Sequence, residues 1–133
     1  MCLSTIDQHK DVPDGVGYKS VVEHGRSRYN SCCGNETPYR LGKWTMAIDH
    51  GPQGIIPADD YSQYLAGFHI LTNKKDALLY LSGEGDMRNE HAIYKVQYRL
   101  ATCKGTQKVW GKRSARHCPC VVAQEIKLLE RIT

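Results

Sequence analysis

Residues 67–81 read Gly-Phe-His-Ile-Leu-Thr-Asn-Lys-Lys-Asp-Ala-Leu-Leu-Tyr-Leu, and this stretch decides the fold more than any other part of the chain. Its first five residues are mostly apolar and favour a buried strand. Asn73 is a residue type that caps helices, and Asp76 falls at the third helical position, close to a capping box. Apolar residues then recur at helical spacing. The stretch predicts a strand, a tight turn and a helix over about residues 73–82.

The size and composition of the chain indicate one globular domain over residues 1–133. Of its 133 residues, 41% are hydrophobic, and no apolar run is long enough to span a bilayer. The first residues have neither the charged nor the apolar segment of a signal peptide. We therefore expect a protein of the cytoplasm with no membrane partner, in which the six cysteines stay reduced.

The remainder of the chain is predicted to be mostly β-structure. Residues 92–103 alternate polar and apolar side chains, and residues 118–129 form an apolar run that favours a second strand, although residues 124–131 also have helical propensity. Residues 104–115, rich in Lys, Arg and Gly, are predicted to form a basic loop. We expect an α+β fold with a mostly antiparallel sheet, one main helix packed on it and a long C-terminal β-hairpin.

Charge is divided unevenly along the chain. Residues 1–94 carry nine Lys or Arg and twelve Asp or Glu, a balance of −3, whereas residues 95–133 carry nine and two, a balance of +7. No acidic residue occurs between Tyr94 and Gln124. Such asymmetry is typical of a basic surface that meets an anionic partner.

The tip of the predicted hairpin is the first candidate for that surface. Cations surround one tryptophan here, in the set Lys104, Lys108, Trp110, Lys112, Arg113 and Arg116. Lysine and arginine neutralise phosphates, and an indole stacks on a base, so the partner classes are a nucleic acid, a nucleotide signal and an acidic protein surface. The alternative is a solvated tip that only aids solubility.

Cysteine and histidine form a second constellation. His117 precedes Cys118 and Cys120, and Cys103 is placed to face them across the hairpin. Zinc takes four such ligands in a tetrahedron, so a structural zinc site is one interpretation, although the usual spacing of paired cysteines is missing. The other interpretation is a group of buried free thiols, since Cys packs as a small hydrophobe. We expect no bound cofactor.

The order of short motifs along the chain resembles that of small, uncharacterised accessory proteins of bacteriophages. The motifs are Met1-Cys2, Tyr18-Lys19-Ser20, the segment from Tyr39 to Trp44, Gly67-Phe68-His69 and the closing hairpin over residues 92–129. This resemblance covers most of the chain. It implies a protein that acts in the cytoplasm of the host cell and alters or blocks a host system, with counter-defence as the expected role.

A second resemblance is at the level of the fold. The Gly-aromatic strand ending in Thr72, followed by Asp76-Ala77 and Tyr80, is similar to the middle motif of ADP-ribosyltransferases, in which a strand and a helix frame a nicotinamide pocket. The resemblance implies NAD as cofactor and a site formed by His69, Tyr80 and Glu125. The alternative for His69 is a core histidine whose hydrogen bonds are satisfied.

These observations predict a non-enzymatic protein that binds and inhibits or sequesters a host component through a basic C-terminal hairpin. An ADP-ribosyltransferase-like enzyme that uses NAD and an interaction module stapled by zinc are the alternatives. A homo-oligomer that holds a nucleotide signal between its subunits also fits the sequence.

Overall fold

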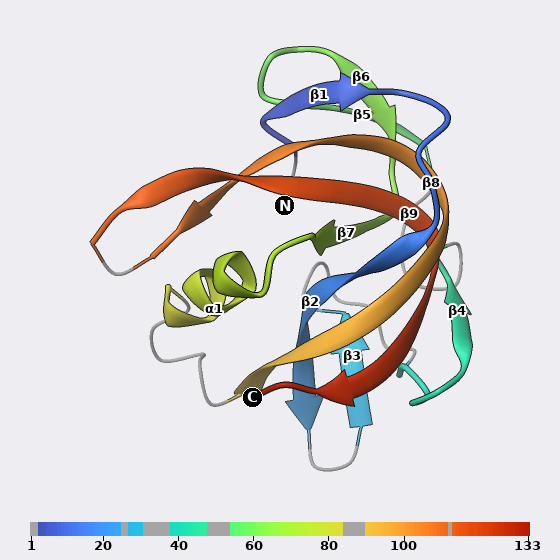
Figure 1. The fold of residues 1–133 in the computed structure, drawn as a ribbon, viewed down its shortest axis with the longest axis vertical. Coiled ribbons are helices and arrows are strands. Elements are labelled where there is room, and N and C mark those ends of the chain that lie inside the picture. The colour runs from blue at the N-terminus through green and yellow to red at the C-terminus, as the bar shows by residue number, and fades with distance from the viewer. Residues whose placement is uncertain (1–2, 25–26, 31–37, 48–53, 84–89, 112) are drawn as a thin grey trace.

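The structure is a computed structural model that describes residues 3–24, 27–30, 38–47, 54–83, 90–111 and 113–133 (Figure 1). Lys112 of the predicted basic set lies outside the described residues. The elements in chain order are β1 (Thr5–Gln8), β2 (Gly15–His24), β3 (Ser27–Asn30), β4 (Trp44–Met46), β5 (Ile55–Pro57), β6 (Gln63–Leu65), β7 (Phe68–Leu71), α1 (Lys74–Ser82), β8 (His91–Trp110) and β9 (Ala115–Arg131).

The fold is built on the long β8–β9 hairpin, with which β1, β2, β4 and β7 pair. Within the described residues the main sheet follows the order β1-β8-β2-β7-β9-β4, with β3 beside β2, and every pairing in it is antiparallel. Because β8 also pairs with β9, the strands β8, β2, β7 and β9 form a closed circuit. Gly17 permits the closure, since a Cβ atom there would lie 2.4 Å from the Ile70 side chain.

Two apolar clusters occupy the two faces of this sheet. Phe68 and Ile70 of β7 belong to one cluster, together with Tyr94 and Val121, whereas Leu71 belongs to the other. The division follows from strand geometry, because successive side chains of a strand point to opposite faces. Burying a side chain of this size contributes about 1.5–3 kcal/mol. The second cluster also takes the apolar side of α1, which lies against β8 and β2 (Figure 1).

The strand–turn–helix prediction for residues 67–81 is confirmed, with one difference in the cap. Asn73 is the N-cap residue and has extended backbone (φ −114°), but its side chain makes no capping hydrogen bond to the helix. The Asn73 amide instead donates to Asp76 Oδ2 at 3.3 Å. The Asp76 carboxylate is therefore buried at the start of the helix.

The predicted basic loop over residues 104–115 is wrong, because β8 continues to Trp110 and β9 begins at Ala115. Only four residues of sequence therefore separate the two strands. The buried positions in this part of β8 are Cys103, Gly105, Gln107 and Val109, and the exposed ones are Lys104, Lys108 and Trp110. The alternation is regular, but Gly and Gln at two inward positions conceal it in the sequence. Residues 124–131 form strand, as favoured over helix.

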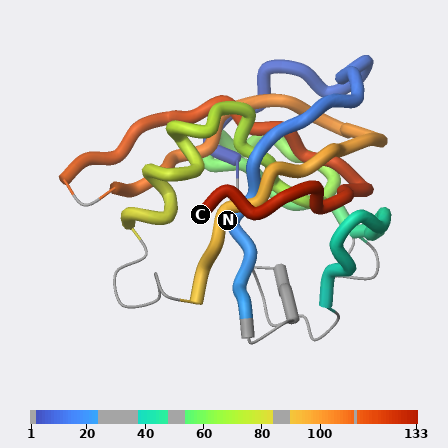
Figure 2. The backbone as a smooth tube through the Cα atoms, turned by 60° about the horizontal axis from the view of Figure 1, so that its bottom comes forward, coloured from blue at the N-terminus to red at the C-terminus, as the bar shows by residue number. Residues whose placement is uncertain are grey.

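The ribbon formed by β8 and β9 bends near its middle. The register shifts between Ala101 and Cys103, and Leu100 has a positive φ of 54°, as expected at a β-bulge. The bend directs the first half of β8 into the closed circuit and lets the second half project with the hairpin tip, beside α1 (Figure 2).

The described residues thus form a mostly antiparallel sheet with one short helix and a C-terminal strand hairpin, which loosely fits the α+β prediction. In the same residues we find no helix of the length and apolar character needed to cross a membrane.

Candidate functional site

The projecting half of the hairpin has two chemically different faces. We call the exposed side the outer face; it consists of Lys104, Thr106, Lys108 and Trp110 of β8 with His117 and Pro119 of β9. Lys108 lies directly opposite His117 in the register, and Trp110 lies opposite Ala115. Arg113 is exposed in the turn. Strand alternation therefore gathers Lys104, Lys108 and Trp110 of the predicted basic set on one surface.

Trp110 is the most prominent side chain of the outer face. It is 63% exposed, and the Lys108 ammonium lies 4.5 Å from the centroid of its ring. A cation at this distance is attracted by the indole quadrupole. The backbone beneath is tightly packed, since a Cβ atom on Gly83, at the end of α1, would lie 1.8 Å from the Trp110 carbonyl oxygen. The exposed ring thus belongs to a strand end that packs against the end of α1.

Arg116 belongs to the opposite, inner face of the hairpin. Its guanidinium forms an ion pair with the buried carboxylate of Asp76 in α1. The contact ties the helix to the hairpin across 40 positions of sequence. The predicted basic set is therefore divided, because Arg116 has a structural partner and does not join Lys104 and Lys108 on the outer face.

The predicted zinc ligands are also divided between the two faces. Cys118 and Cys120 are buried on the inner face, whereas His117 is exposed on the outer face. Burial raises the pKa of Cys103 to about 11 and that of Cys120 to about 12, so these thiols are protonated at neutral pH. Among the described residues no three His, Cys, Asp or Glu side chains are grouped closely enough to hold a metal ion. Cys103, Cys118 and Cys120 lie buried in the second apolar cluster.

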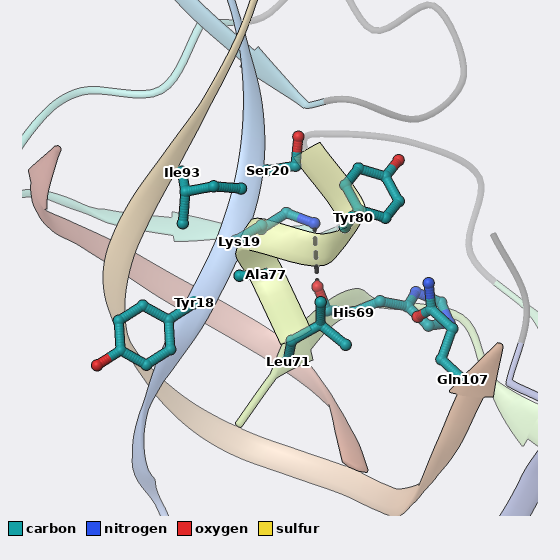
Figure 3. Close-up of a pocket in the computed structure, with 9 residues that line it drawn as sticks. All are labelled: Tyr18, Lys19, Ser20, His69, Leu71, Ala77, Tyr80, Ile93 and Gln107. Atoms are coloured by element: carbon teal, nitrogen blue, oxygen red, sulfur yellow. Dashed lines mark hydrogen bonds between the residues drawn. The ribbon is translucent and has the colours of Figure 1, made fainter. Parts of the chain in front are cut away.

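His69 lies at the margin of a small pocket beneath α1 (Figure 3). Its Nε2 atom is 2.9 Å from the Tyr64 hydroxyl, which also accepts a 3.0 Å hydrogen bond from the Leu3 amide. Burial, assisted by the charge of Lys19, lowers the pKa of His69 to about 3. The imidazole is therefore neutral and its hydrogen bonding is satisfied within the protein.

Tyr80 also lines the pocket, whereas Glu125 does not. The pocket has a volume of about 10 Å³, which is room for about one water molecule and not for a nicotinamide ring. Glu125 instead forms an ion pair with Arg99 and lies opposite Met46 in the register of β9 and β4. The structure thus brings together His69 and Tyr80 of the predicted nicotinamide site and places the third residue elsewhere.

One cluster was not anticipated from the sequence. Trp44 of β4 has the Arg99 guanidinium 3.8 Å and the Lys127 ammonium 4.7 Å from the centroid of its ring. Trp44 lies opposite Lys127 in the register. The pairing of a three-residue edge strand with β9 has no local signature, so no sequence signal indicated that these cations meet the ring.

We compared the chain with protein-family models, with curated proteins and with solved structures, and none of the three comparisons gave a match.

Proposed function

We propose that this protein is a binding protein that recognises an anionic partner through the outer face of its C-terminal hairpin. The observation that carries the proposal is the exposure of Lys104 and Lys108 on the same side of β8 as the exposed ring of Trp110, with Arg113 exposed in the segment that follows. The only acidic residues in positions 95–133 are Glu125 and Glu130, which lie outside the projecting half of the hairpin. Cations concentrated in this way raise the local concentration of an anion and accelerate its association.

The two faces of the hairpin support the proposal by their contrast. The inner-face cation, Arg116, has a carboxylate partner within the protein, whereas the Lys108 ammonium lies over an exposed aromatic ring. An exposed Lys–Trp pair contributes little to folding, about 0.5–1 kcal/mol. The ring and the ammonium are therefore available to a partner.

The resemblance to bacteriophage accessory proteins supplies the setting of the proposal. In that setting the anionic partner is a host component, and binding inhibits or sequesters it. No enzymatic step is needed for this role. The neutral, hydrogen-bonded His69 and the water-sized pocket beneath α1 are in keeping with a structural part for that region.

The test is the salt dependence of binding to a polyanion. Labelled oligothymidylate, polyphosphate and polyglutamate are titrated with the full chain at several salt concentrations. Each cation that contacts a single-stranded oligomer contributes about 0.7 to the slope of log Kd against log salt. The double variant Lys108→Ala/Arg113→Ala is expected to weaken binding and to lower this slope for oligothymidylate by about 1.4.

The matched control removes two exposed cations at the other end of the molecule. Arg40→Ala/Lys43→Ala changes the net charge equally, and these residues precede β4, which lies opposite the hairpin tip in Figures 1 and 2. This variant should leave the slope unchanged. Equal losses in both variants, or no binding to any of the three anions, would remove the proposal.

A further inference from the structure

We infer that the outer face of the hairpin binds single-stranded nucleic acid, with one base stacked on the indole of Trp110. This inference rests on the proposed function and names the chemical class of its partner. Three features of the described residues carry it: the exposure of the ring, the fixed position of its backbone, and the line of cations that leads to it.

The ring of Trp110 is available to a planar ligand. It is 63% exposed, and the Lys108 ammonium lies 4.5 Å from its centroid. Stacking on aromatic side chains, with cations beside the ring, is the usual way in which proteins hold the bases of a single strand. In a duplex the bases are stacked on one another, so an indole on a protein surface does not reach their faces. The geometry therefore favours a single strand over a duplex.

The position of Trp110 is fixed although it lies next to the turn. Its neighbour Val109 is 1% exposed and anchors the strand end in the second apolar cluster. The Gly111 amide donates to the Ser114 carbonyl at 2.7 Å and closes the turn. The end of α1 supports the carbonyl of Trp110 from below, at Gly83. Because the backbone beneath the ring is fixed before binding, less conformational entropy is lost when a base stacks on the ring.

The cations of the outer face lie along one strand. Lys104 and Lys108 are four residues apart on the same side of β8, hence roughly 13 Å apart, and His117 lies beside Lys108. A flexible phosphate backbone can follow such a line. At the far end of this line, Gln8 of β1 is the register partner of Lys104.

The experiment separates base stacking from attraction of phosphates. The full chain is titrated with an oligothymidylate of about 15 nucleotides and with an abasic oligomer of the same length and charge. We expect the oligothymidylate to bind at least fivefold more tightly. Trp110→Ala should weaken its binding by roughly 5- to 150-fold, the cost of one lost stacked base, and should change the affinity for the abasic oligomer less than twofold.

Fluorescence provides a second readout, because the chain has two tryptophans. In Trp44→Phe the emission of Trp110 should be quenched by oligothymidylate and not by the abasic oligomer. The difference between the unsubstituted protein and Trp110→Phe gives the same information if Trp44→Phe does not fold.

The outcomes distinguish this inference from the proposed function. Equal affinity for both oligomers without quenching would overturn base stacking and leave anion binding intact. Binding of polyglutamate but of neither oligomer would overturn nucleic acid as the partner and favour an acidic protein surface. Failure to bind any polyanion would overturn both.

Discussion

Both tryptophans of this chain have cationic side chains over the ring, but Trp110 is more exposed to solvent than Trp44. Trp44 is half-buried on the β4–β9 edge, with Arg99 and Lys127 both over its ring and Arg99 held in turn by Glu125. Trp110 is mostly exposed and has Lys108 over its ring. The first site satisfies its cations and its aromatic ring within the fold. The second leaves both open to a partner.

The difference teaches that a cation–aromatic pair is not by itself a binding site. Trp44 belongs to β4, the strand at the edge of the sheet, and its cations come from β8 and β9. Trp110 lies at a strand end that α1 already fastens through Gly83 and through the Asp76–Arg116 ion pair. The exposed pair is therefore not needed for fastening.

The largest effects are expected when each tryptophan is replaced by alanine in turn. Trp110→Ala should weaken oligothymidylate binding by roughly 5- to 150-fold and lower the free energy of unfolding by no more than about 1 kcal/mol, because the ring is exposed and its pair with Lys108 contributes about 0.5–1 kcal/mol. Trp44→Ala should do the reverse and lower stability by about 1–2 kcal/mol through loss of two cation–π contacts. Urea denaturation and anisotropy measure the two quantities. Equal losses of binding and of stability in the two variants would contradict the different roles assigned to the two rings.

A methyl group on Gly83 tests whether α1 supports the Trp110 platform. In Gly83→Ala the new Cβ atom would lie 1.8 Å from the Trp110 carbonyl oxygen, so the end of the helix or the strand end must move. Overpacking of this kind costs about 1–3 kcal/mol, and we expect weaker oligothymidylate binding as well. Leu78→Ala, at an exposed position of the same helix, is the control. Unchanged stability and binding would show that the support is unnecessary.

The free energy of unfolding is expected to depend on pH below neutrality because of His69. The pKa of His69 is about 3 in the folded protein and about 6.5 in the unfolded chain, because burial disfavours the imidazolium. Protonation below pH 6.5 therefore favours unfolding, and stability falls toward pH 3 by at most about 1.4 kcal/mol per pH unit; above pH 6.5 this group has no effect.

The variant His69→Gln removes this titration. Its free energy of unfolding, measured by urea denaturation between pH 7 and 5, should fall less steeply than that of the unsubstituted protein. A parallel pH dependence in His69→Gln and in the unsubstituted protein would contradict the buried, neutral imidazole.

The smallest expected effect is that of Glu125→Gln. Arg99 is 43% exposed on its side chain, and an ion pair so close to solvent contributes about 0–1 kcal/mol. We expect a small loss of stability, with oligothymidylate binding unchanged. A large loss of binding would place the anion at Trp44 instead of Trp110. Loss of an NAD-consuming activity would favour the ADP-ribosyltransferase interpretation.

The local part of this fold could be predicted from the sequence. The strand and helix of residues 67–81 follow from apolar spacing and from the residue type at Asn73. The second half of β8 has the sequence pattern of a loop because Gly105 and Gln107 occupy inward positions where an apolar residue is expected. Gly105 must be small there, since a Cβ atom would lie 1.9 Å from the Thr5 carbonyl oxygen of the neighbouring strand.

The contacts that divide the candidate site could not be predicted. Asp76 and Arg116 are 40 positions apart, and no local pattern in the sequence indicates that they form a pair. Whether His117 joins Cys118 and Cys120 depends on whether this segment is strand or loop, because strand alternation turns adjacent residues to opposite faces. The charge imbalance of residues 95–133 is visible in the sequence, but which of its cations already have partners is a property of the fold.

The most direct test asks which tryptophan responds to the anion. Oligothymidylate is added to Trp44→Phe, which retains Trp110, and to Trp110→Phe, which retains Trp44, and the emission of each is followed. Our account predicts quenching in the first protein and constant emission in the second. Quenching only in the protein that retains Trp44, with oligomer bound, would contradict the assignment of the outer face as the binding surface.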